Sequence, residues 1–259
     1  MRRGLQLLTL LFLCSILAGA QDLSLYQKHF YINGNDTMPY RLLLPDKYDA
    51  TKKYPLLFFL HGAGERGNNN ELQLVHGAKL FLKEENRKNY PAIVVFPQCP
   101  ASSFWSNVDI KMENGKRIFS FREAGEPTIG MRLAQELLQQ LLKTYPISKK
   151  QVYVGGLSMG GMGTFEIVRR NPKLFAAAIP ICGGGNTATA PALKKTKWWV
   201  FHGGKDDVVP PKLSEDMVEA MKKEKANVKF TLYPNANHNS WDAAFAEPDL
   251  LSWLFRQKR

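Results

Sequence analysis

The sequence has little of what metal, nucleotide and redox proteins depend on. Its 259 residues include only 3 cysteines and 5 histidines, and these do not stand at the spacing of a metal-binding cluster. The phosphate-binding pattern G-x-x-x-x-G-K-[ST] does not occur. Internal repeats and low-complexity tracts are absent as well. We therefore expect chemistry that needs neither a metal nor a cofactor.

Long hydrophobic runs are scarce, and the one that stands out lies at the start of the chain. Two arginines precede an apolar run from Leu5 to Leu17, and Ala18-Gly19-Ala20 follows it. This is the tripartite pattern of a secretory signal. The run is shorter than the roughly 20 residues that span a bilayer. We expect residues 1–20 to be a signal peptide cleaved after Ala20, and residues 21–259 to be periplasmic or secreted, without stable membrane insertion. An uncleaved anchor, or a lipid on Cys14, is the alternative.

Acidic residues are fewer than basic ones, and the formal net charge is +12. A nucleic-acid module would carry aromatic side chains between its basic residues, whereas runs such as Lys194-Lys195 carry none. We therefore expect no nucleic-acid partner. Most of these lysines are typical of solvated helix and loop faces. A surplus of positive charge of this size also favours binding to acidic glycans or lipids.

The hydrophobic pattern predicts one α/β domain. Residues 26–32 and 40–44 read as two strands joined by the turn-rich segment 33–36, which favours an antiparallel pair. Apolar runs typical of buried parallel strands follow at 56–60, 92–96, 152–154, 176–181, 198–201 and 228–233. Helical patterns lie between or after them at 71–82, 128–144, 160–170, 212–224 and 240–255. Alternation of this kind predicts a parallel sheet with helices on both faces.

A candidate nucleophile stands where one of these strands runs into a helix. The segment Gly156-Leu157-Ser158-Met159-Gly160 matches G-x-S-x-G. A sharp strand-to-helix turn strains the serine backbone, and the flanking glycines let neighbouring chain pass close by. The hydroxyl of Ser158 then projects at a helix N-terminus, where the partial positive charge favours an oxyanion.

A serine needs a base to take its proton, and His238 is the best placed of the histidines because it lies in the loop between the last strand and the last helix. The imidazole in turn needs a carboxylate partner. Asp206 and Asp207 both follow the preceding strand, and the residues themselves leave these two candidates open. For the oxyanion hole we expect the backbone N–H groups of Ala63, in a glycine-rich loop, and of Met159.

These motifs resemble the α/β-hydrolase superfamily, and more closely the small carboxylesterase and phospholipase-like group related to prolyl oligopeptidase catalytic domains. The matching segments are His61-Gly62-Ala63-Gly64-Glu65-Arg66-Gly67, Phe96 to Pro100, Gly156 to Gly160, His202 to Asp206 with Val209-Pro210, and His238-Asn239-Ser240-Trp241. The resemblance implies a mostly parallel eight-stranded sheet. Since the family's acid stands three residues before the valine of a Val-Pro pair, it also implies that Asp206 is the acid.

The function implied by the resemblance is hydrolysis of carboxylic esters through an acyl-enzyme, with feruloyl or acetyl esters on polysaccharides among the expected substrates. The substrate is thus expected to be a small-molecule or glycan-linked ester. One alternative is a serine peptidase related to prolyl oligopeptidase, because the same triad cleaves amides. A second alternative, from another class, is a binding protein without catalytic activity.

The resemblance also predicts the surroundings of the site. Only about 14 residues separate Cys182 from the next strand, which excludes a large lid there. The insertion 100–126 is then the expected wall of the pocket. Trp105 and Trp241 are candidate substrate-binding residues that could stack on a sugar or an aromatic acyl group, and packing in the core is the alternative for either of them.

The resemblance's strand order places Cys99 and Cys182 at the ends of strands three spacings apart. At about 4.8 Å per spacing this is roughly 14 Å, whereas bridged Cα atoms lie within about 7 Å. We expect free thiols.

Overall fold

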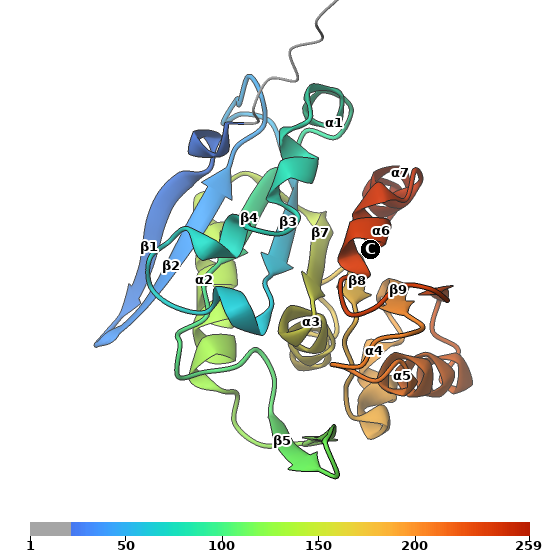
Figure 1. Ribbon diagram of the computed structural model, residues 1–259. Helices are drawn as coiled ribbons and strands as arrows, with labels where there is room; N and C mark the ends of the chain where they lie inside the picture. The colour runs from blue at the N-terminus through green and yellow to red at the C-terminus, as the bar shows by residue number, and fades with distance from the viewer. Residues whose placement is uncertain (1–21) are drawn as a thin grey trace, which may run out of the picture.

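The computed structural model describes residues 22–259, so the predicted signal peptide, residues 1–20, lies outside the described part of the chain. Its centre is an eight-stranded sheet in the order β1-β2-β4-β3-β7-β8-β9-β10 (Figure 1). The strands are β1 Gln27–Asn33, β2 Asp36–Leu43, β3 Tyr54–Leu60, β4 Ile93–Pro97, β7 Ile147–Leu157, β8 Ala177–Ile181, β9 Lys197–Gly203 and β10 Val228–Tyr233.

The sheet opens with the predicted antiparallel pair and is parallel from β4 onward. β1 pairs with β2, and β2 pairs antiparallel with β4. The turn between β1 and β2 has only two residues, with Gly34 at φ 59°, so β2 begins at Asp36, earlier than predicted. The remaining neighbours, from β4 through β3 and β7 to β10, are all parallel. Their carboxyl ends therefore lie along one edge of the sheet, and this edge holds the candidate site.

Helices cover both faces of the sheet, as predicted. One hydrophobic core contains buried side chains of α2 Ile129–Thr144, α3 Met159–Arg170, α4 Ala190–Leu193 and α5 Lys212–Lys223. The other contains side chains of α6 Trp241–Ala246 and α7 Leu250–Arg256. α1 Glu84–Asn89 is a short exposed helix, and the short 3-10 helices are η1 Leu23–Leu25, η2 Ala63–Glu65, η3 Leu72–Leu74, η4 Ala78–Leu82 and η5 Thr187–Thr189.

Two of the predicted helices are wrong in extent. The segment 71–82 forms the separate 3-10 helices η3 and η4, because Gly77 between them adopts a left-handed backbone with φ 83°. The segment 240–255 is divided into α6 and α7. Glu247, which precedes Pro248, is extended at φ −59° and ψ 119°, as expected from the clash of a proline ring with a helical preceding residue.

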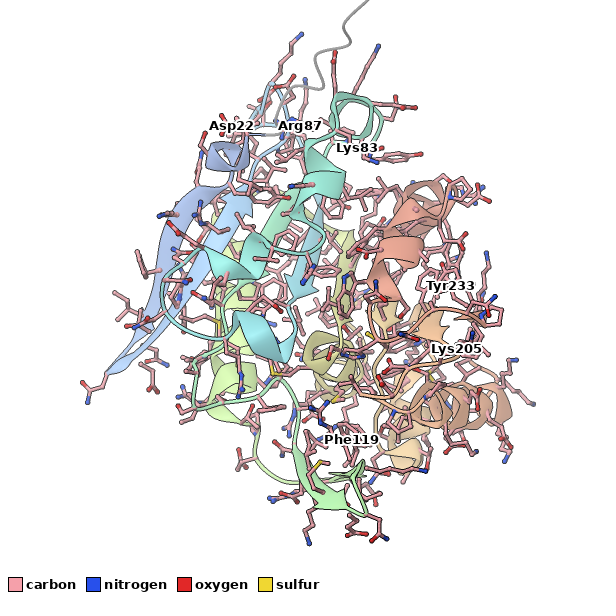
Figure 2. All side chains as sticks on the ribbon, viewed as in Figure 1. Asp22, Lys83, Arg87, Phe119, Lys205 and Tyr233 are labelled. Carbon is pink, nitrogen blue, oxygen red and sulfur yellow. The ribbon has the colours of Figure 1, made fainter. Side chains whose placement is uncertain are left out.

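The insertion 100–126 contains a hairpin that we did not predict. β5 Val108–Glu113 and β6 Lys116–Phe121 form a two-stranded sheet that projects from the molecule beyond α3 (Figure 1). Phe119, labelled in Figure 2, lies on this hairpin. The ring of Phe121 comes within 3.4 Å of the position that a Cβ on Gly184 would take, so the hairpin covers the chain just after β8.

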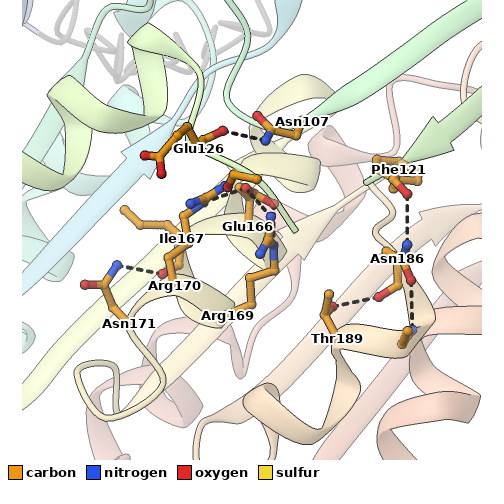
Figure 3. Close-up of polar contacts among 12 residues, drawn as sticks. Asn107, Phe121, Glu126, Glu166, Ile167, Arg169, Arg170, Asn171, Asn186 and Thr189 are labelled. Atoms are coloured by element: carbon orange, nitrogen blue, oxygen red, sulfur yellow. Dashed lines mark hydrogen bonds and ion pairs between the residues drawn. The ribbon is translucent and has the colours of Figure 1, made fainter. Parts of the chain in front are cut away.

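Hydrogen bonds tie the C-terminal end of this hairpin and the chain just after it to the main domain (Figure 3). Arg170 of α3 donates to the Gly125 carbonyl oxygen over 2.8 Å, and Glu166 holds the Arg170 guanidinium at 2.7 Å. Asn186 donates to the Phe121 carbonyl oxygen over 2.9 Å. These hydrogen bonds hold the insertion beside the carboxyl edge of the sheet.

The connection from β8 to β9 carries only η5 and α4, in agreement with the predicted lack of a large lid. Cys99 and Cys182 are both buried and free, as expected. Between residues 22 and 259, no helix combines the length and the apolar character that a membrane span requires.

Candidate active site

Ser158 sits in a strained turn between β7 and α3. Its backbone has φ 53° and ψ −118°, a conformation that residues other than glycine rarely adopt. Neighbouring chain crowds the turn: a Cβ on Gly156 would collide with the Gly160 carbonyl group, and one on Gly160 would collide with the Leu60 carbonyl oxygen. The two glycines therefore allow β3, β7 and α3 to meet at the serine.

The structure brings Ser158, His238 and Asp206 together in one line of hydrogen bonds. His238 Nε2 lies 2.9 Å from Ser158 Oγ, and His238 Nδ1 lies 2.8 Å from Asp206 Oδ2. In the productive tautomer, Nδ1–H donates to the carboxylate and Nε2 accepts from the serine hydroxyl. This arrangement orients the imidazole of His238 and would let its Nε2 take the proton of the Ser158 hydroxyl.

Asp206 is held as an anion although its side chain is fully buried. Burial alone would raise the pKa of its carboxyl group, but hydrogen bonds from His202, His238 and the Val209 N–H hold that pKa well below its usual range. Oδ1 accepts from the backbone N–H groups of Val208 and Val209, each over 2.9 Å. Asp207 is exposed on the same turn. Of the two candidates, Asp206 is therefore the one hydrogen-bonded to His238, whereas Asp207 faces solvent.

His202 is a second histidine beside Asp206, and no motif in the sequence predicted a role for it. Its ring is completely buried, with Nε2 3.2 Å from Asp206 Oδ2 and 2.9 Å from the Val209 carbonyl oxygen. Its Nδ1 lies 2.7 Å from Ser214 Oγ. One feature of the sequence could have predicted this contact: His202 lies at the end of β9, four residues before Asp206.

The loop after β3 passes beside Ser158 and leads to Ala63, the first residue of η2. The position of a Cβ on Gly62 is 3.7 Å from Ser158 Cβ. Met159 is the first residue of α3. The first amides of a helix have no partner within it, so the N–H groups of Ala63 and Met159 are free to serve as an oxyanion hole.

His61 is buried beneath this loop and holds its backbone through hydrogen bonds. Its Nδ1 is 2.6 Å from the Gly62 carbonyl oxygen, and its Nε2 accepts from the Cys99 N–H over 2.9 Å. These partners require a neutral ring with the proton on Nδ1. Burial lowers the pKa of His61 to about 4, which favours the same state.

The prediction that Trp105 binds substrate is wrong in this structure. Its side chain has 0% exposure and its indole N–H donates to the His61 carbonyl oxygen over 3.0 Å. Trp105 therefore supports the loop from within the core. Trp241 is half-buried and meets the ring of His238 edge-on at 5.4 Å between centroids, so it remains a candidate substrate-binding residue.

One group of side chains in the described part of the chain has the composition of a metal site. Potential ligand atoms of Cys182, Asp206 and His238 lie within 4.8 Å of one another. Asp206 and His238 are already hydrogen-bonded to each other. Burial raises the pKa of the Cys182 thiol, which disfavours the thiolate that a metal would bind. The group fits proton transfer better than metal binding.

The strand order and the serine at the β7–α3 turn define an α/β hydrolase. The chain belongs to the family of putative esterases, whose model matches residues 33–240.

Individual relatives agree with this family. The chain is similar to endo-1,4-beta-xylanase Y of Acetivibrio thermocellus, with 24% identity over 82% of this chain and 21% of the xylanase. It is 25% identical to the probable feruloyl esterase C of Aspergillus oryzae over 66% of this chain and 56% of that protein. The crystal structure of a thermostable esterase superposes with a TM-score of 0.80 and 34% identity, covering 90% of this chain and 63% of that one. The chain thus spans less than two thirds of each of these proteins.

Proposed function

We propose that the protein is a serine hydrolase of carboxylic esters. The observation that carries the proposal is the hydrogen-bonded line from Ser158 through His238 to the buried Asp206. Membership of the putative esterase family supports it. In this assignment Ser158 is the nucleophile, His238 the general base and Asp206 the residue that orients the base.

The proposed reaction has two acyl-transfer steps. His238 takes the Ser158 proton as Oγ attacks the ester carbonyl carbon, and the imidazolium then gives that proton to the departing alcohol. Water, activated by the same histidine, attacks the acyl-enzyme and releases the acid. Asp206 stabilises the imidazolium in both steps. The N–H groups of Ala63 and Met159 would bind the oxyanion, aided by the N-terminus of α3.

The absence of a large lid between β8 and β9 favours a bulky or polymer-linked ester over a buried lipid tail. The similarity to a xylanase and to a probable feruloyl esterase supports acyl esters on plant polysaccharides, of feruloyl or acetyl type. We also propose that residues 1–20 direct export, that residues 21–259 form a single catalytic domain, and that the protein works in the periplasm or outside the cell.

The test is hydrolysis of p-nitrophenyl acetate, p-nitrophenyl butyrate, methyl ferulate and a proline-anilide peptide. Ser158→Ala is compared with Ser24→Ala, which changes an exposed serine in η1. Ester turnover that persists in Ser24→Ala and is lost in Ser158→Ala supports the proposal. Cleavage of the anilide alone would assign a peptidase, and silence on every substrate would favour a binding protein.

A further inference from the structure

We propose that His202 is a positioning residue of the active site, which holds the turn after β9 so that the Asp206 carboxylate meets His238. The inference rests on the proposed function, because it concerns the base of the same reaction. His202 is completely buried, so it acts through its neighbours and not on a substrate.

The surroundings of the His202 ring decide which nitrogen carries a proton. Nε2 lies 2.9 Å from the Val209 carbonyl oxygen and 3.2 Å from Asp206 Oδ2. A carbonyl oxygen and an ionised carboxylate can only accept hydrogen bonds. Nε2 therefore carries a proton and donates it to Val209, close enough to Asp206 to stabilise the negative charge on Oδ2.

Ser214 of α5 holds the opposite nitrogen of the ring. Its Oγ lies 2.7 Å from His202 Nδ1 and 2.9 Å from the Gly183 carbonyl oxygen. Both side chains are completely buried, where the low dielectric strengthens hydrogen bonds. The helix α5 also packs against β9 (Figure 1). The ring is thus fixed between α5 on one side and the turn after β9 on the other.

The turn from Asp206 to Val209 is closed by the carboxylate and by His202 together. Asp206 Oδ1 accepts from the N–H groups of Val208 and Val209, and the Val209 carbonyl oxygen accepts from His202. Asp206 Oδ2 faces the two imidazoles, at 2.8 Å from His238 Nδ1 and 3.2 Å from His202 Nε2. His202 therefore restrains both the carboxylate and the backbone that carries it.

Removal of the His202 donor should disturb the base without touching the substrate. A buried carbonyl group that loses its donor is costly, so the turn at Val209 would move toward another donor and carry Asp206 with it. A small displacement of Asp206 lengthens its 2.8 Å hydrogen bond to His238 and turns the imidazole away from the serine. The expected loss is therefore in kcat, with KM unchanged.

The kinetic test compares two replacements of His202. His202→Phe keeps most of the volume of the ring but has no donor, whereas His202→Gln loses the ring but can place an amide N–H near the position of Nε2. We expect kcat to fall about 10- to 100-fold in His202→Phe with KM within about twofold, and His202→Gln to retain more of kcat. Native kcat in His202→Phe, or a higher kcat in His202→Phe than in His202→Gln, would assign the residue to core packing alone.

Two further variants make this test independent of folding. His29→Phe is the matched control: it changes a half-buried histidine of β1, at the other end of the sheet, and should keep kcat within about twofold. If circular dichroism shows that His202→Phe does not fold, Ser214→Ala replaces it, because this variant keeps the imidazole and removes one hydroxyl. We expect kcat to fall about two- to tenfold in Ser214→Ala, and an unchanged kcat would overturn the proposal.

Proton NMR separates failure of this proposal from failure of the proposed function. The proton between His238 Nδ1 and Asp206 Oδ2 should resonate downfield of the amide protons, and its displacement in Asp206→Asn identifies it. In His202→Phe this resonance should move or broaden, and in His202→Gln it should lie nearer its native position. An identical resonance in the native chain and in His202→Phe would overturn the proposal. If the native chain hydrolysed no ester, the proposed function would fail, yet a displaced resonance would still show that His202 positions Asp206.

Discussion

The Leu60 carbonyl oxygen occupies the space that a Cβ on residue 160 would need. Gly160→Ala should therefore destabilise the protein by at least about 2 kcal/mol, because the clash is with backbone that cannot rotate away. Gly64→Ala is the control, since nothing lies within 4 Å of its added Cβ, and its stability should stay within about 0.5 kcal/mol. Urea unfolding measures both. Equal stability of the two variants would contradict the close packing of β3 against α3.

Asp206 and Asp207 differ in burial and should differ in their effect on rate. Asp206→Asn should lower kcat for the best ester by roughly 10³- to 10⁴-fold, because the amide no longer holds the productive tautomer of His238. Asp207 is exposed, so Asp207→Asn should keep kcat within about twofold. Steady-state kinetics at neutral pH compares the two. A large loss in Asp207→Asn alone would reverse the assignment of the acid.

His61 should make the fold sensitive to mild acid. Burial lowers its pKa from 6.5 to about 4, so below pH 6.5 the unfolded chain binds a proton that the folded chain excludes. The stabilisation is complete above pH 6.5 and is lost as the pH falls toward 4, by roughly 3 kcal/mol at most. Urea unfolding from pH 7 to 4 should show this loss, and the curve should be flatter in His61→Asn. An equally steep loss in the variant would assign the effect to other groups.

Cys99 and Cys182 should resist thiol reagents in the native protein. Burial raises the pKa of Cys99 to about 12 and raises that of Cys182 further above its usual range, so both stay protonated at pH 8. In a Cys14→Ser background, Ellman's reagent should label neither thiol until urea is added, and then both. Rapid labelling of the folded protein would show that one of them is accessible.

The meeting of Ser158, Asp206 and His238 could be anticipated because each follows a strand of a parallel sheet. β7, β9 and β10 end at the same edge, so chemistry-bearing residues just beyond those ends lie close together. The choice of Asp206 over Asp207 needed a family resemblance, since which side chain turns inward depends on the path of the loop.

Other features depended on contacts that no local pattern records. The burial of Trp105 follows from its hydrogen bond to the chain at His61, 44 residues away in sequence. The helix predicted over 71–82 had a suitable apolar pattern, but Gly77 takes a left-handed conformation. The β5–β6 hairpin did leave a signal: Asn114-Gly115, both at positive φ, joins two alternating segments. Asn-Gly is the commonest hairpin turn of this type.

Ser158, Asp206 and His238 follow three different strands, β7, β9 and β10, which are made at different times during synthesis. β10, whose following loop carries His238, is the last strand along the chain and lies at the edge of the sheet. A chain that stops before residue 238 lacks the imidazole that lies 2.9 Å from Ser158 Oγ. Under the proposed function, such a chain would have the serine and the carboxylate but would hydrolyse no ester.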